Sequence, residues 1–199
     1  MINLALFSAL SAFYFTMFIT PGPNNAMLTA SGMKFGFIRT LPHLIGIPLG
    51  HIFQIALVCF GLANLFLIYP QIQFYMKILC FLYLLYLSWK MIGSISLDKK
   101  ETGRPLKLYE ASLFQFINPK AWSIAIAVAS GFFPTEENIF IGVGFVTITA
   151  AVICFPSISL WALFGSGLRT FINNEKTKKL TEYFLALLLV LTGLFILIK

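Results

Sequence analysis

The chain has 199 residues, of which 59% are hydrophobic and only 11% are charged, and its mean hydropathy is +0.89. A soluble domain carries about 25% charged residues, so this composition excludes an ordinary soluble domain and predicts an integral membrane protein. Fourteen Lys and Arg outnumber seven Asp and Glu. In a membrane protein such an excess indicates cytoplasmic loops, and we expect no nucleic-acid partner.

Six apolar segments are long enough, or nearly so, to cross a bilayer, which takes about 20 residues. In chain order they cover about 3–33, 37–67, 71–93, 108–133, 138–165 and 180–198. We therefore expect an all-α membrane protein, a single transmembrane domain over 1–199 with six transmembrane segments. One long hydrophilic stretch, about 94–107, separates two halves at about 3–93 and 105–199.

Positive charge orients these segments in the membrane. If the basic loop at about 94–107 is cytoplasmic, alternation of the spans also places Lys34, Arg39 and the cluster at 176–179 inside. Both termini are then predicted to lie outside. Three spans per half would make the second half enter from the opposite side, which is the inverted-repeat arrangement of many secondary transporters.

The first span is interrupted by the sequence TPGPNN. Prolines cannot continue a helix, and unpaired backbone groups inside lipid are tolerated only where they line a protein-walled or watery cavity. The break therefore predicts a cavity lined by Pro21, Gly22, Pro23, Asn24 and Asn25. A kink that serves only packing is the alternative.

A second break, FINPKAW, lies in the corresponding span of the second half and contains Asn118, Pro119 and Lys120. Half-helices expected at about 24–33 and 120–132 would each begin near the membrane midplane. Because a helix N-terminus carries free N–H groups and partial positive charge, the two ends with Lys120 are expected to bind an anionic group, most naturally an amino acid's carboxylate. Carbonyls left free before each break could receive its ammonium.

Three residues on the 37–67 segment are assigned to the coupling or transport pathway: Gly46, Gly50 and His51. An ionisable residue within a membrane span is a functional candidate by default. The alternatives are a neutral histidine hydrogen-bonded between helices, and a small-xxx-small step for close helix packing. The three cysteines lie singly in apolar runs, so we expect packing, with no metal and no cofactor.

Three motifs occur in order: TPGPNN, then GMKFGFIRTLPHLIGIPLGH over Gly32–His51, then FINPKAW. With the length and the six apolar segments, the whole chain resembles the LysE/RhtB family of amino-acid exporters. The resemblance implies a multi-pass protein of the bacterial inner membrane that exports amino acids or their derivatives as a proton-coupled antiporter. It does not identify the substrate. Two residues depart from the family pattern: Pro48 is not part of it, and His51 stands where many relatives carry an acidic residue.

No Ser-His-Asp order, H-E-x-x-H, P-loop or G-x-G-x-x-G motif occurs, so no enzyme is expected. The expected partners are a small substrate with a carboxylate, the proton and membrane lipids, and a homo-oligomer is left open. A passive channel or facilitator for small polar solutes is the alternative function, because a polar midplane cavity serves either.

Overall fold

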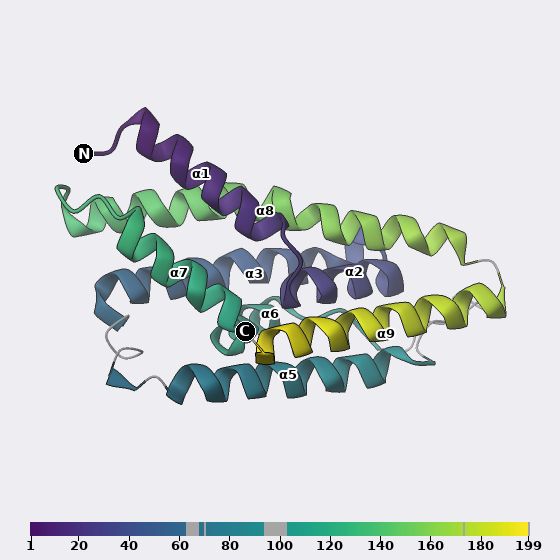
Figure 1. Cartoon of the computed structure of the whole chain (residues 1–199). Coiled ribbons are helices and arrows are strands. Elements are labelled where there is room, and N and C mark those ends of the chain that lie inside the picture. Colours follow the sequence, from purple (N-terminus) through teal and green to yellow (C-terminus); the bar gives the residue numbers. More distant parts are fainter. Residues whose placement is uncertain (63–67, 70, 94–102, 173, 199) are drawn as a thin grey trace.

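The helices of the computed structural model form one bundle, described over residues 1–62, 68–69, 71–93, 103–172 and 174–198 (Figure 1). Residues 63–67 of the expected second span, 94–102 of the basic loop, and Lys199 lie outside these ranges. The elements are α1 (Leu4–Ile19), α2 (Pro23–Phe35), α3 (Phe37–Leu57) with the π-helical turn η1 (Val58–Leu62), α5 (Gln71–Met91), α6 (Leu108–Phe114), the 3-10 turn η2 (Gln115–Ile117), α7 (Pro119–Gly131), α8 (Ile139–Leu168), the 3-10 turn η3 (Arg169–Phe171) and α9 (Glu175–Ile198).

Within the described residues, four helices are long and apolar enough to cross a membrane: Phe37–Leu62, Phe74–Met91, Ile139–Leu168 and Glu175–Ile198. A fifth span results if α1 and α2, which are bent by 56° at their break, count as one. The chain is therefore a multi-pass, all-helical membrane protein over its described residues.

The fourth expected span, at about 108–133, is not confirmed by the described helices, although the break inside it is present. Helix α6 has only seven residues, or about 10 Å of helix. Residues 103–107 before it are not helical, and Lys107 is extended. Pro105 contributes to this, because a proline disfavours helical backbone in the residue before it.

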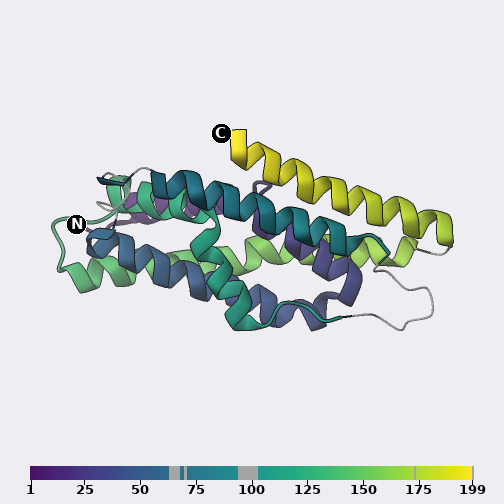
Figure 2. The same cartoon turned by 90° about the horizontal axis from the view of Figure 1, so that it is seen from below.

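Figures 1 and 2 place the junction of α2 with α3, the end of α5 and the junction of α8 with α9 at one end of the bundle. The N-terminus, the start of α5 and the junction of α7 with α8 lie at the other end, toward which α9 runs back. Helices α1 and α2 pack on α8, and α6 and α7 pack on α3. Helix α3 also packs on α8, and α5 packs on α9.

Two glycines allow helices α2 and α8 to touch backbone to backbone. A Cβ on Gly32 of α2 would lie 2.2 Å from the carbonyl oxygen of Ala162, and one on Gly165 of α8 would lie 2.1 Å from that of Thr29. Lipid supplies no hydrophobic force between helices, so close van der Waals contact of this kind stabilises the bundle. Helices α2 and α8 are thereby held at fixed separation.

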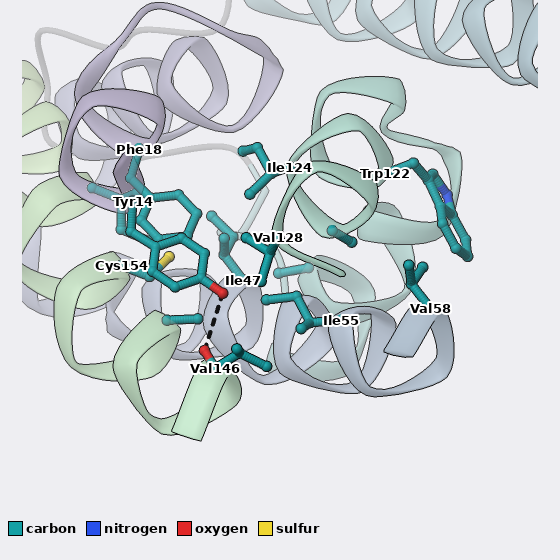
Figure 3. Packing of buried hydrophobic residues seen from close by; sticks show 14 of the residues in the cluster. Tyr14, Phe18, Ile47, Ile55, Val58, Trp122, Ile124, Val128, Val146 and Cys154 are labelled. Atoms are coloured by element: carbon teal, nitrogen blue, oxygen red, sulfur yellow. Dashed lines mark hydrogen bonds between the residues drawn. The ribbon is translucent and has the colours of Figure 1, made fainter. Parts of the chain in front are cut away.

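The apolar core lies beside the first break and joins α1, α3, α7 and α8 (Figure 3). Tyr14 is fully buried there, stacks on Phe18 with ring centroids 5.4 Å apart, and donates a 3.0 Å hydrogen bond to the carbonyl of Val146. Cys154 packs in the same cluster and Cys80 in a second one. Both cysteines serve packing, as their apolar surroundings in the sequence indicated.

Replacing Gly165 by Ala is expected to destabilise the protein by about 1–3 kcal/mol, because the new methyl group would overlap the backbone of Thr29. Gly144 lies in the same helix, and a Cβ there would meet nothing within 4 Å. Gly144→Ala is therefore the matched control and should be neutral or mildly stabilising. Thermal unfolding of the two purified variants in detergent measures the difference, and equal melting temperatures would contradict the close packing.

Candidate functional site

The first break interrupts the chain between Ile19 and Pro23. Thr20 (φ −67°, ψ 144°) and Gly22 (φ −179°, ψ 178°) are extended, so the backbone cannot continue α1. Both continuing helices begin on a proline, α2 at Pro23 and α7 at Pro119, one residue earlier than expected. A proline suits a first helical position, because its fixed φ is helical and its missing N–H would have no partner there.

Side chains satisfy the carbonyls at the end of α1. The Asn25 side-chain amide donates to the carbonyls of Phe18 and Thr20, each at 2.8 Å. The indole of Trp161, on α8, donates to the carbonyl of Ile19 at 3.1 Å. The break is thus held open by dedicated donors. Asn25 belongs to the predicted motif, whereas no sequence signal distinguishes Trp161 from a packing residue.

The Lys120 ammonium, on α7, lies across the same break. It donates to the Thr20 carbonyl at 2.8 Å, to the Thr20 hydroxyl at 2.9 Å and to the Pro21 carbonyl at 3.3 Å. Gly22 makes room for it, since a Cβ there would lie 2.9 Å from Cδ of Lys120. In this conformation the lysine therefore occupies the carbonyls that the sequence offered to a substrate's ammonium.

The second break is joined directly to the first. Asn24 and Gln115 form a reciprocal amide pair, with hydrogen bonds of 2.9 and 3.1 Å. Gln54 of α3 donates to the carbonyl of Gln115 at 3.2 Å. The side chain of Asn118 caps α7 by accepting from the backbone N–H of Lys120 at 3.1 Å. Gln115 and Gln54 lie outside the predicted motifs, and the one sequence signal for them is a polar amide within an apolar span.

His51 lies next to this network and is only 2% exposed. Its Nδ1 is 3.3 Å from the side-chain oxygen of Gln54, and its ring meets Phe18 edge-on. Its Nε2 has no hydrogen-bond partner among the described residues. A buried polar atom without a partner costs about 1–3 kcal/mol, so this nitrogen requires a functional explanation or a bound water.

A small cavity of about 30 Å³ lies between the two breaks. Seven of the predicted site residues line it: Gly22, Pro23, Asn24, Asn25, His51, Asn118 and Lys120. Pro21 and Pro119 stand at the breaks without lining it. A water needs about 10–15 Å³ by this measure, so the cavity has room for about two waters and none for an amino acid in this conformation.

Gly46 and Gly50 lie away from the cavity and pack α3 against α6. A Cβ at either position would fall within 2.3–2.4 Å of a backbone oxygen, that of Leu108 or of Ser112. The hydroxyl of Ser112 also donates to the carbonyl of Gly46 at 2.8 Å. Their contacts are those of close helix packing, which fixes α6 and hence Gln115 beside the first break.

No group of three or more His, Cys, Asp or Glu side chains in the described ranges is close enough together to hold a metal ion. The polar groups around the cavity are amides, carbonyls, one ammonium and one imidazole. Such groups bind a small polar solute through hydrogen bonds and charge.

Comparison with known proteins adds an independent observation. A family model described as LysE type translocator matches residues 15–199. Cysteine/O-acetylserine efflux proteins of Salmonella paratyphi A and Salmonella typhi are 30% identical over 161 residues, which cover 78% of this chain and 82% of theirs. The cysteine/O-acetylserine efflux protein of Escherichia coli K12 is 28% identical over the same coverage. No solved structure matches the chain.

The amide pair is tested by a double-mutant cycle. Asn24→Ala and Gln115→Ala should each destabilise the protein, and the double variant should lose about 1 kcal/mol less than the sum, because both single changes remove the same interaction. Unfolding in detergent is the measurement. Asn24→Ala combined with Asn138→Ala, a helix cap at α8, should be additive. Additive losses for the Asn24 and Gln115 pair would mean that the amides do not interact.

Proposed function

This chain belongs to the LysE type translocator family, and from that membership we propose that it exports a small amino acid or amino-acid derivative from the bacterial cytoplasm. Proteins of this family are transporters, and the chain is not an enzyme. The names of its relatives, cysteine/O-acetylserine efflux proteins, make cysteine and O-acetylserine the first substrates to test.

The cavity between the two breaks is the observation that carries this proposal. Two thirteen-residue helices, α2 and α7, begin at its wall with Pro23 and Pro119. The partial positive charge at both N-termini suits a carboxylate, although the N–H of Lys120 at the start of α7 already donates to the Asn118 side chain. The carbonyls of Thr20 and Pro21 already bind an ammonium, that of Lys120. An amino acid offers both charges at the spacing of one carbon atom.

Lys120 gives substrate binding a defined order. The cavity has no room for an amino acid while the lysine side chain lies beside Gly22, so the lysine withdraws as the substrate's ammonium takes its place on the carbonyls. The exchange leaves the carbonyls of Thr20 and Pro21 satisfied before and after. The displaced ammonium then adds its charge to the region where the carboxylate binds.

The apolar part of the cavity wall completes the site. Met17, Ile47, Ile124 and Ile158 line it opposite the polar groups. A short side chain such as that of cysteine or the acetyl group of O-acetylserine would contact these residues. Charged side chains would lose hydration there without gaining a partner.

The membrane arrangement belongs to the same proposal. The α1–α2 pair packs on α8 as the α6–α7 pair packs on α3, while α3 packs on α8 and α5 on α9. This pairing is what two inverted repeats, about 3–93 and 105–199, would produce. The cations Lys34, Lys90 and Arg104 line one cavity at one end of the bundle, which supports that end as the cytoplasmic side of the inner membrane and both termini outside.

Transport of O-acetylserine by proteoliposomes tests the function. We expect counterflow, in which unlabelled substrate on one side accelerates uptake of the labelled compound, because a carrier exchanges substrate and a pore does not. Lys120→Ala should reduce the rate about tenfold or more, since a charge-assisted interaction is lost. Lys120→Arg should also be impaired, because the guanidinium keeps the charge and loses the geometry.

Lys77→Ala removes the same charge from α5 at a position outside the cavity lining and is the control for net charge. If neither the parent protein nor any variant transports O-acetylserine or cysteine, the proposed substrate class of small amino acids is refuted. Unchanged transport in Lys120→Ala would refute the role of the lysine.

His51 is proposed to couple transport to the proton gradient, because it lines the cavity and its buried Nε2 has no hydrogen-bond partner among the described residues. His51→Gln retains hydrogen bonding without a titratable ring. The variant is expected to keep counterflow of O-acetylserine and to lose accumulation driven by an imposed pH gradient. Equal gradient-driven accumulation in the variant and the parent would assign His51 to packing.

A further inference from the structure

A second, larger cavity of about 140 Å³ lies near the C-terminal end of α2, on the proposed cytoplasmic side. We call it the outer chamber because it lies at that end of the bundle. Its wall is built from α2 (Ala30, Lys34), α3 (His43), α5 (Lys90) and the extended segment that contains Arg104. At about 10–15 Å³ for each water, it has room for roughly ten waters. This volume is sufficient for a small amino acid.

The described lining of the outer chamber carries three cationic side chains and no carboxylate: Lys34, Lys90 and Arg104. Arg104 also forms a bidentate pair with Glu110, at 2.6 and 2.7 Å, just outside the lining. Lys90 lies over the ring of Tyr86, 4.7 Å from its centroid. Glu110 offsets much of the charge of Arg104, and the excess of cations that line the chamber still produces a positive potential that attracts anions.

His43 provides an observation independent of this charge. The side chain is 2% exposed and lines the chamber, yet neither Nδ1 nor Nε2 has a hydrogen-bond partner among the described residues. A neutral imidazole always carries one N–H donor. Both nitrogens are closed off from solvent in this conformation, so the ring has to turn before an anionic oxygen in the chamber can accept from it and remove the cost of leaving it unpaired.

We propose that the outer chamber is a second binding site, which holds the carboxylate of the exported solute before it enters the central cavity; this rests on the proposed function. The two cavities share α2 and α3. Pro23 and His51 line the central one, and Lys34 and His43 line the outer one. His43 and His51 are eight residues apart, or about 12 Å along the helix, so a solute moves two helical turns between the sites.

The state of the central cavity supports this order of binding. Lys120 fills the ammonium position there, so a solute that arrives has no vacant site until the lysine moves. The outer chamber has both space and the unpaired imidazole of His43 in the same conformation. Met27, Leu87 and Leu189 add apolar wall against which the rest of a small zwitterion can lie.

A cysteine introduced at position 30 reports on the chamber without relying on transport. Ala30→Cys is made in a protein whose Cys59, Cys80 and Cys154 are replaced by Ala, and is reconstituted in vesicles of neutral phosphatidylcholine. Reaction rates are compared for an anionic and a cationic methanethiosulfonate reagent. We expect the anionic reagent to be favoured, and Lys90→Ala to lower the ratio about threefold because it removes a positive charge. His43→Leu removes only a hydrogen-bond donor and should instead weaken protection of the thiol by O-acetylserine.

Lys77→Ala is the matched control, since it removes the same charge from the same helix, 13 residues away. That separation is about 20 Å along α5 and exceeds the Debye length of about 8–10 Å, so the ratio should not change. Lys90 is exposed, so its replacement should not impair folding. His43→Leu removes unpaired buried polar atoms and should not lower the melting temperature.

O-acetylserine should slow the labelling of the introduced thiol, and Lys90→Ala should raise the half-saturating concentration for export with little change in the maximum rate. An unchanged reagent ratio in Lys90→Ala would overturn the anion site. Protection by phosphatidylglycerol vesicles but not by O-acetylserine would assign the chamber to a lipid phosphate and overturn the solute assignment. Protection by O-acetylserine in a protein that exports nothing would refute the proposed function and leave the outer chamber standing.

Discussion

Every backbone carbonyl freed inside a membrane protein must find a donor within the protein, because lipid offers none. The first break frees four consecutive carbonyls, those of residues 18–21, and each accepts from a side chain: Asn25, Trp161 or Lys120. These donors come from α2, α8 and α7. The requirement therefore draws three helices to one point and builds the polar centre of an otherwise apolar bundle.

The two breaks meet this requirement in the same way. Each uses a donor from the helix that follows it, Asn25 for the first and the Trp122 indole, bonded to the carbonyl of Phe116, for the second. Each also uses a donor from a long facing helix, Trp161 of α8 and Gln54 of α3. Helices α3 and α8 occupy equivalent places in the proposed repeats. Two solutions of one kind would follow from a duplicated unit that has kept its chemistry and changed its residues.

The breaks and most of the cavity lining could be predicted because proline and asparagine within an apolar run are local signals. Trp161, Gln54 and Gln115 could not, since a donor to a free carbonyl is selected by tertiary contact and its residue type is common in packing roles. The position of the Lys120 ammonium also depends on which carbonyls lie opposite α7. The expected span at about 108–133 is not confirmed as one long helix, because counting apolar residues does not register the extended chain around Pro105 that leaves α6 only seven residues long.

The ammonium of Lys120 on the Thr20 and Pro21 carbonyls has a further consequence for selectivity. A bacterial cytoplasm contains many small carboxylic acids that lack an amino group, and an exporter that recognised the carboxylate alone would drain them. Such an acid could displace Lys120 only by leaving the Pro21 carbonyl without a donor, at about 1–3 kcal/mol, and the Thr20 carbonyl with the Asn25 amide alone. An amino acid supplies the replacement itself. The lysine would thus select against metabolic acids that lack an amino group. The cell would retain these acids while it exports solutes that carry an ammonium.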